Sequence, residues 1–417
     1  MINMIKNKIQ NYKTVIHNFG YLSFLQLFNV LLPLVTYPYL IRILGSELYG
    51  MVIFAQAIVL YFSILINFGF NISATKDVAE YKENNEKLNE IVSSVFSIKT
   101  FLWAFSLVIL LILIQVIPSF NKHGWLFVFA FGITFNEFLF PQWFFQGIEK
   151  MRYITFINII SKIFFTLFIF VFVKNEGDYL LVPLFQSAGA LIGGLIALYI
   201  LTVKEKVSFV IQKKDTIRYY FLESLPLFVS AASIQIYVNA NKVLVGAFLG
   251  MTEVAYYDLG EKILRLIKTP VGMLGQAAFP SLAKQKSILK INNMMKIGVT
   301  LTVGLIIFVF VFGEFIVNVL GGKDMLNAIP VMRILSISAL MVAFSQFLGT
   351  SRLIIFGFKK EFTQIIASSG VVFCILGFVL YMSHSITVIS LAWLAVAVET
   401  WVTFVMFLVN YNKKLLK

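Results

Sequence analysis

Segments of mostly apolar residues, each about 20 residues long or longer, follow one another along the whole chain with short polar connections between them. A helix needs about 20 such residues to cross a lipid bilayer. Only 13% of the 417 residues are charged, whereas about 25% is typical of a soluble domain. The sequence therefore predicts an all-α polytopic membrane protein with twelve membrane-spanning helices, at about 15–42, 48–73, 93–117, 124–146, 153–173, 179–203, 221–248, 254–279, 293–320, 327–356, 363–382 and 386–410.

The basic residues of the connections are distributed unequally between the two sides of the membrane. Alternate connections, counted with both termini, hold 22 Lys and Arg, and the other set holds only Lys122, Lys174 and Lys323. Short cytoplasmic connections carry the excess of Lys and Arg in membrane proteins. Both termini are therefore predicted to be cytoplasmic. The net charge of +14 is explained by this asymmetry, and no nucleic-acid partner is expected.

Two weak sequence matches indicate an internal duplication. Leu44-Gly45 aligns with Leu249-Gly250, and Gly147 aligns with Gly357, at offsets of 205 and 210 residues, close to half the chain length. Six spans in each half is an even number, so the halves enter the membrane in the same orientation. Transporters with such parallel repeats bind their substrate between the halves. The expected domains are two six-helix bundles, 1–208 and 209–417.

Several charged residues lie inside predicted spans, where they are costly and usually mark a substrate or ion pathway. Lys242 lies seven residues from the outer end of the seventh span, roughly 10 Å deep at the helical rise. Arg265 and Lys268 share one face of the eighth span at i,i+3 spacing, and their positive charge suits a phosphate group. The candidate substrate-binding residues are Lys242, Arg265, Lys268, Arg42, Asn239 and Tyr37.

Plainer interpretations of these charged residues stay open. Lys242 and Arg42 can extend along the apolar surface to the outer interface, and we expect Lys99 and Lys162 to do so at the inner interface. Some basic residues in the eighth span have acidic neighbours at i,i+4 spacing, which allows ion pairs without a ligand role. These pairs are Asp258–Lys262 and Glu261–Arg265.

Carboxylates within the spans are candidates for binding a coupling ion, either H⁺ or Na⁺. The alternative for Glu137 and Glu399 is an ion pair with an intramembrane Lys or Arg. The candidates are Glu137, Glu399, Glu261 and Asp258.

The sequence contains no pattern of an enzyme or of a metal site. The three His residues are dispersed, the single Cys374 allows no disulfide within the chain, and no phosphate-binding loop of an ATPase occurs. The predicted outer connections of three to six residues are too short for a catalytic loop. We expect no catalytic residues, no metal and no cofactor.

Four motifs resemble those of the Wzx-type O-antigen and polysaccharide flippases, within the multidrug/oligosaccharidyl-lipid/polysaccharide exporter superfamily. They are LGSELYG (44–50), NFGFNISATKDVA (67–79), WFFQGIEKMRYI (143–154) and FPSLAK (279–284). The second motif departs from the family pattern, because Thr75-Lys76 stands where an Arg often precedes the Ala. Together with the twelve-span layout, the resemblance extends over essentially the whole chain.

The resemblance implies a function in lipopolysaccharide or related polysaccharide biosynthesis. A monomer in the bacterial cytoplasmic membrane would flip an undecaprenyl-pyrophosphate-linked oligosaccharide to the outer leaflet, by ion-driven alternating access of two bundles around a basic cavity. Polysaccharide assembly proteins would be its partners. A multidrug cation antiporter of the same superfamily is the alternative, disfavoured because basic residues outnumber acidic ones in the relevant spans. A membrane polysaccharide polymerase is disfavoured by the short outer connections.

Overall fold

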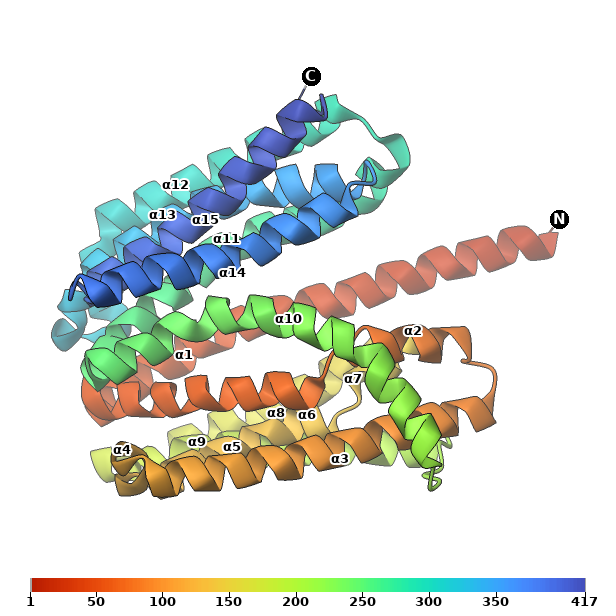
Figure 1. Cartoon of the computed structure of the whole chain (residues 1–417), viewed down its shortest axis with the longest axis horizontal. Coiled ribbons are helices and arrows are strands. Elements are labelled where there is room, and N and C mark those ends of the chain that lie inside the picture. Colours follow the sequence, from red (N-terminus) through yellow and green to blue (C-terminus); the bar gives the residue numbers. More distant parts are fainter. Residues whose placement is uncertain (1, 417) are drawn as a thin grey trace. The chain divides into compact units, whose positions relative to one another are not determined.

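The computed structural model describes residues 2–416, with side chains described for residues 20–416 except 233, 234, 236, 237 and 280. All regular elements of this part of the chain are helices (Figure 1). The chain divides into two compact units, of which unit 1 comprises the residues up to Thr36 and Ala55–Ala232, and unit 2 comprises Tyr37–Phe54 and the residues from Ser233 onward. The domains 1–208 and 209–417 stay a prediction.

Nine helices of the described residues are long and apolar enough to cross a membrane. One of them, Gly20–Asn67, has 48 residues, and Gly45 interrupts it with a φ of 71°, so it provides two helical segments of spanning length. The helices α10 and α11 have 35 residues each and add two more. The described helices are thus consistent with the predicted twelve, and an all-α membrane fold is confirmed.

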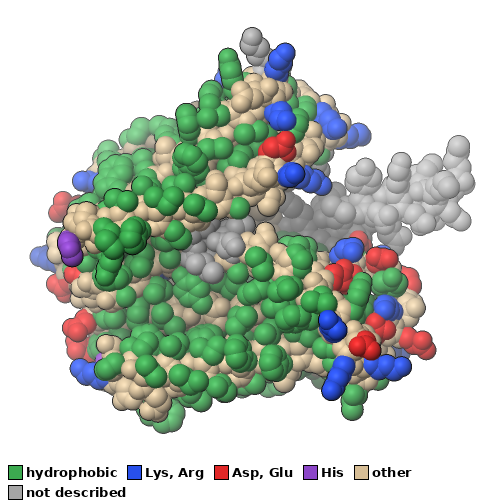
Figure 2. All heavy atoms as spheres, viewed as in Figure 1, with side chains coloured by type: hydrophobic (Ala, Val, Ile, Leu, Met, Phe, Trp, Pro, Cys, Tyr) green, Lys and Arg blue, Asp and Glu red, His purple; other side chains and the backbone are tan. Residues whose placement is uncertain are grey.

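Unit 1 is built around a helical layer in which α9 packs against α8, α5 and α6, and α3 packs against α5. Hydrophobic side chains cover the middle of its helices on the visible face, and charged side chains gather near helix ends (Figure 2). Its elements are α1 (Ile2–Asn67, which unit 2 shares), α2 (Ser73–Glu80), α3 (Asn85–Val116), α4 (Pro118–Lys122), α5 (Gly124–Phe131), η1 (Gly132–Thr134), α6 (Phe135–Leu139), α7 (Gln142–Gly147), α8 (Met151–Phe172), η2 (Glu176–Leu180), α9 (Leu181–Tyr199) and η3 (Ile200–Lys204).

The aromatic motif WFFQG forms the core at one end of unit 1. Trp143, Phe144 and Phe145 of α7 are each at most 1% exposed. Gly147 follows them because a Cβ there would lie 2.5 Å from a methyl group of Val78 on α2. The charged residues after the motif lie at the surface, where the Lys150 ammonium contacts the Glu205 carboxylate at 2.6 Å.

Unit 2 is centred on α13, which packs against α11, α12 and α15, while α14 packs against α15. Arg352 lies in a π-helical turn after α13, is 1% exposed and donates to the Asn292 side chain of α12. The elements of this unit are α10 (Lys214–Phe248, which begins in unit 1), α11 (Met251–Gln285), α12 (Ile288–Gly321), η4 (Lys323–Ala328), α13 (Ile329–Ser345), η5 (Gln346–Ile354), α14 (Lys359–Met382) and α15 (Val388–Asn412).

The segment Tyr37–Phe54 of α1, here named the N-terminal hairpin, packs within unit 2 although the chain on both sides of it belongs to unit 1. Two glycines allow this close packing. A Cβ on Gly50 would lie 1.7 Å from the backbone oxygen of Met251, and a Cβ on Gly246 would lie 2.2 Å from the ring of Phe54. The hairpin therefore contacts the backbone of α11 directly at Gly50, and it packs the ring of Phe54 onto the backbone of α10 at Gly246.

This contact predicts that Gly50→Ala lowers the free energy of unfolding. Replacing a helical glycine by alanine normally stabilises a helix by roughly 0.5–1 kcal/mol. At Gly50 the added methyl group overlaps a backbone atom, so we expect a loss of about 1–3 kcal/mol in the free energy of unfolding. Thermal unfolding of the purified protein in detergent measures the change. Gly304→Ala in α12 is the matched control, because nothing lies within 4 Å of a Cβ there. Equal shifts in both variants would contradict the packing described.

The short helix α2 is fixed to the first part of α10 by polar contacts. The hydroxyl oxygens of Ser73 and Ser224 lie 2.7 Å apart, and the Lys76 ammonium lies 3.6 Å from the Glu223 carboxylate. Asp77 is only 7% exposed beside them. Burial raises the pKa of the Asp77 carboxyl from 3.8 to about 6, and the Glu223 carboxylate adds to the rise, whereas Lys76 opposes it.

The raised pKa predicts a pH dependence of stability. The folded state holds the Asp77 proton more tightly than the unfolded state, so its contribution is fully present below about pH 4 and is lost as pH rises towards 6. Asp77→Asn should therefore be more stable than the unmodified protein at pH 7, and the difference should vanish near pH 4. Melting temperatures across this range measure it. Glu83→Gln, an exposed acid just after the same helix, serves as the control. A difference independent of pH would refute the assignment.

Candidate functional site

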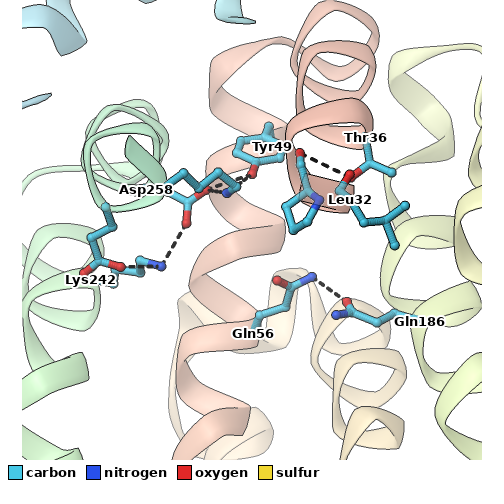
Figure 3. Close-up of polar contacts among 10 residues, drawn as sticks. Leu32, Thr36, Tyr49, Gln56, Gln186, Lys242 and Asp258 are labelled. Carbon is cyan, nitrogen blue, oxygen red and sulfur yellow. Dashed lines mark hydrogen bonds and ion pairs between the residues drawn. The ribbon is translucent and has the colours of Figure 1, made fainter. Parts of the chain in front are cut away.

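The carboxylate of Asp258 is the centre of a polar network within unit 2 (Figure 3). It accepts hydrogen bonds from the Tyr49 hydroxyl and the Lys242 ammonium, each at 2.8 Å. The ammonium of Lys262 also contacts it. Asp258 itself is 4% exposed at its side chain, so the three donors surround a buried charge. We name Tyr49, Lys242, Asp258, Glu261 and Lys262 the Asp258 network.

Three helical segments bring these side chains together. Asp258, Glu261 and Lys262 share one face of α11, because residues three and four apart are neighbours on a helix. Lys242 comes from α10, before the turn at Gly250 that joins α10 to α11. Tyr49 comes from the N-terminal hairpin. The network thus fixes the hairpin to both helices that the turn at Gly250 joins.

Two tyrosine rings of the hairpin enclose Lys262. Its ammonium lies 4.9 Å from the ring centroid of Tyr37 and 5.5 Å from that of Tyr49, and the two rings meet edge to face at 5.2 Å. The Lys262 ammonium also lies 2.8 Å from the Tyr49 hydroxyl. A cation near aromatic faces is stabilised by their negative quadrupole, and more strongly where water is excluded. Tyr37, a predicted site residue, therefore packs beside the network.

The network is balanced in charge, with two lysines and two carboxylates. The Lys242 ammonium lies 2.8 Å from Glu261 as well as from Asp258. This arrangement rules out the extension of Lys242 to the outer interface. The predicted Asp258–Lys262 pair is present, but the predicted Glu261–Arg265 pair is not, because Glu261 pairs with Lys242 across the turn. The network around Lys242 therefore carries no surplus of positive charge.

Arg265 and Lys268 follow the network along α11. Lys268 contacts Glu399 of α15 at 3.3 Å, with the two side chains 29% and 32% exposed. This ion pair gives Glu399 the basic partner that the alternative interpretation expected. Arg265 is exposed, and within the described part of the chain no carboxylate lies at ion-pair distance from it. In this region four basic side chains (Lys242, Lys262, Arg265 and Lys268) thus face three acidic ones (Asp258, Glu261 and Glu399), and the excess charge belongs to Arg265.

Two predicted site residues make their hydrogen bonds away from the network. The Arg42 guanidinium donates to the backbone oxygen of Val319 at 2.5 Å, in the last turn of α12, where helix carbonyl groups lack internal partners. The Asn239 side chain donates to the backbone oxygen of Gln235 at 2.9 Å, within α10.

Glu137 lies in unit 1 with partners of its own. Its carboxylate accepts a hydrogen bond from Asn67 at 2.7 Å, and its backbone oxygen accepts one from the Lys99 ammonium at 2.7 Å. Lys99 is 1% exposed, so the prediction that it extends to the membrane interface is wrong: its charge is satisfied inside the unit. Lys162, expected to do the same, lies 2.5 Å from the side-chain oxygen of Asn29 and is half-buried.

Sequence reasoning missed two members of the network. Tyr49 stands in the motif LGSELYG, and Lys262 stands four residues after Asp258. The presence of Tyr49 in a family motif could have indicated its role. Lys262 was interpreted only as the partner of Asp258 on the same helix, so its contacts with the hairpin were not expected. The sequence analysis also missed a polar contact between two helices of unit 1. The side-chain amides of Gln56 and Gln186 lie 2.8 Å apart (Figure 3). No group of three or more potential metal ligands occurs among the described residues.

The central position of Asp258 predicts a large effect of Asp258→Asn. Removing one charge from a buried set leaves the remaining charges unpaired, which costs about 3–5 kcal/mol. We expect a loss of this size in the free energy of unfolding, measured by thermal unfolding in detergent. Glu399→Gln is the matched control, since its pair with Lys268 is partly exposed and such pairs contribute about 0–1 kcal/mol. A similar small loss in both variants would show that Asp258 does not hold the network together.

Comparison with known sequences gives one family and two curated relatives. A family model described as "Polysaccharide biosynthesis protein" matches residues 15–286. A protein of Escherichia coli strain K12 described as "Putative O-antigen transporter" is 28% identical over 422 residues, covering 99% of this chain and 100% of the relative. A protein of Shigella dysenteriae with the same description is 26% identical over 71% of this chain and 75% of its own length.

Comparison with solved structures identifies the fold. An inward-facing multidrug resistance MATE family transporter of the MOP superfamily superposes with a TM-score of 0.72 at 13% identity, over 94% of this chain and 98% of the other. The lipid II flippase MurJ, in an inward closed conformation, superposes with a TM-score of 0.69 at 16% identity, over 94% of this chain and 87% of the other. At these identities the likeness shows a shared fold.

Proposed function

The chain belongs to the polysaccharide biosynthesis protein family, whose model covers residues 15–286, and from this premise we propose that it flips a lipid-linked oligosaccharide across the bacterial cytoplasmic membrane. The substrate proposed is an undecaprenyl-pyrophosphate-linked repeat unit of O-antigen or a related surface polysaccharide. It moves from the inner to the outer leaflet by alternating access, with both termini of the protein in the cytoplasm.

The names of the relatives support this proposal. Two curated relatives are described as O-antigen transporters, one of them matching end to end, and a flippase for lipid II has the same fold. The helices of spanning length fit a multi-pass membrane protein. The MATE likeness alone also fits a multidrug antiporter, but the family match favours a polysaccharide precursor as the substrate.

The observation that carries the proposal is the row of basic side chains on α10 and α11, within helices of membrane-spanning length. Arg265 is exposed and has no acidic partner among the described residues, so its planar guanidinium is free to bind phosphate oxygens in pairs. Lys242 and Lys268 are further bases on the same two helices, and both are paired with carboxylates. We assign these three residues to the diphosphate group of the substrate.

Carboxylates that touch these bases supply a route for ion coupling. Glu399 pairs with Lys268, and Glu261 and Asp258 pair with Lys242. A proton or Na⁺ bound at one of these carboxylates would weaken its hold on the lysine, and the lysine would then be available to an anion. Glu137 of unit 1, held by Asn67, is the fourth candidate for the coupling ion.

The proposal predicts the phenotype of the combined variant Lys242→Gln, Arg265→Gln and Lys268→Gln. Each lost charge-assisted hydrogen bond to a phosphate weakens binding, by roughly 1.5–3 kcal/mol. In cells that lack their own O-antigen transporter, this variant should restore surface glycan at least about tenfold less than the unmodified chain. Surface glycan is measured by immunoblot, together with the amount of protein in the membrane.

The matched control removes three charges elsewhere, through Lys82→Gln, Lys204→Gln and Lys213→Gln, all at exposed positions. It should display glycan normally. Full display by the variant at normal protein level, or drug efflux without glycan display by the unmodified chain, would refute the proposed function.

A further inference from the structure

We propose that Glu261 is an internal competitor for the anionic group of the substrate, and that it thereby sets how tightly the site binds an anion. Glu261 pairs with the Lys242 ammonium, and an anion of the diphosphate class takes its place there. This inference rests on the proposed function, which assigns Lys242 to the diphosphate.

The two carboxylates that touch Lys242 are held very differently. Asp258 accepts from Tyr49, Lys242 and Lys262, and it is 4% exposed. Glu261 is 21% exposed, and among the described residues Lys242 is its one ion-pair partner. Asp258 is therefore a fixed part of the site, whereas Glu261 can leave towards solvent after losing a single contact.

Of the two lysines in the network, Lys242 is the one that can replace a carboxylate partner by a phosphate oxygen. The Lys262 ammonium contacts Asp258 and the Tyr49 hydroxyl, and the rings of Tyr37 and Tyr49 cover it. An ammonium group has three donors. Those of Lys242 are directed to Asp258 and to Glu261, so the departure of Glu261 exposes a donor that a phosphate oxygen can accept.

Exchange avoids an unpaired charge at every stage. A lysine left alone in a low-dielectric region would carry a large desolvation cost. In the exchange Lys242 keeps Asp258 throughout and gains a phosphate oxygen as Glu261 leaves. Arg265 lies one helical turn beyond Glu261 and is exposed, so it can attract the anion before the exchange takes place.

A competitor of this kind lowers the affinity of the site for every anion that must displace it. The free energy of breaking the Lys242–Glu261 ion pair is lost from the binding of a diphosphate and of a monophosphate alike. Glu261 therefore sets the affinity for the diphosphate group through the strength of its own contact with Lys242.

The test measures binding of inorganic pyrophosphate and inorganic phosphate to the purified full chain in nanodiscs by calorimetry. Glu261→Gln should bind pyrophosphate roughly tenfold more tightly than the unmodified chain, the size of one charge-assisted hydrogen bond. The gain for phosphate should be of the same size, because both anions displace the same carboxylate. Glu261→Ala is a second variant with the same expectation, and melting temperatures establish that both are folded.

Two controls isolate the exchange at Lys242. Glu253→Gln removes the same charge from the first turn of α11, and Glu253 is not one of the two carboxylates that pair with Lys242. It should leave both affinities unchanged. Adding Lys242→Gln to Glu261→Gln should abolish the gain, because the two residues act on one bond.

Unchanged or weaker pyrophosphate binding in both Glu261 variants, or no binding by any protein, overturns the inference, as does an equal gain in Glu253→Gln. The proposed function is judged separately by glycan display of the unmodified chain and of the variant that lacks Lys242, Arg265 and Lys268. Normal display by the former and loss by the latter, with no effect of Glu261 on anion binding, refutes the competitor and leaves the flippase intact.

Discussion

The shared carboxylate of Asp258 is the interaction on which the arrangement of unit 2 depends. It contacts a tyrosine of the N-terminal hairpin, a lysine of α10 and a lysine of its own helix. Buried charges persist only where each has a partner of opposite sign and good geometry. Because the partners of Asp258 come from three helical segments, satisfying this one carboxylate also fixes where the hairpin, α10 and α11 meet.

Rules about residues close together in the sequence predicted those parts of the site that depend on a single helix. Apolar segment length predicted the helices, and i,i+4 spacing predicted the Asp258–Lys262 pair. Glu261 was harder, because it has Arg265 one turn away on its own helix and Lys242 across a turn, and the tertiary contact is the one formed. Lys268 with Glu399, and Lys99 with the backbone of Glu137, follow the same rule. Sequence indicates how deep a charge lies in a membrane helix, but its partner depends on how the helices pack.

The motif LGSELYG shows how one short segment can serve several physical requirements. Leu44 is 2% exposed, and Gly45 adopts the positive φ that breaks α1 into two helices. Tyr49 donates to Asp258, and Gly50 allows contact with the backbone of Met251. The matching glycine of the proposed duplication, Gly250, has a positive φ at the break between α10 and α11. The turn was therefore visible in the sequence, whereas the packing of this segment within unit 2 required the structure.

Charge balance reconciles two demands on the anion site proposed for unit 2. A site with four unpaired bases would bind phosphate strongly, but it would be costly to hold in a low-dielectric region while empty. Matching three of the four bases with acids lowers that cost, and leaves Arg265, the most exposed of them, to provide the attraction. The acids then differ in how firmly they are held, from the enclosed Asp258 to the singly bonded Glu261. Binding of an anion leaves the number of bases in the proposed site unchanged. The affinity for the anion therefore depends on which acid must leave its base.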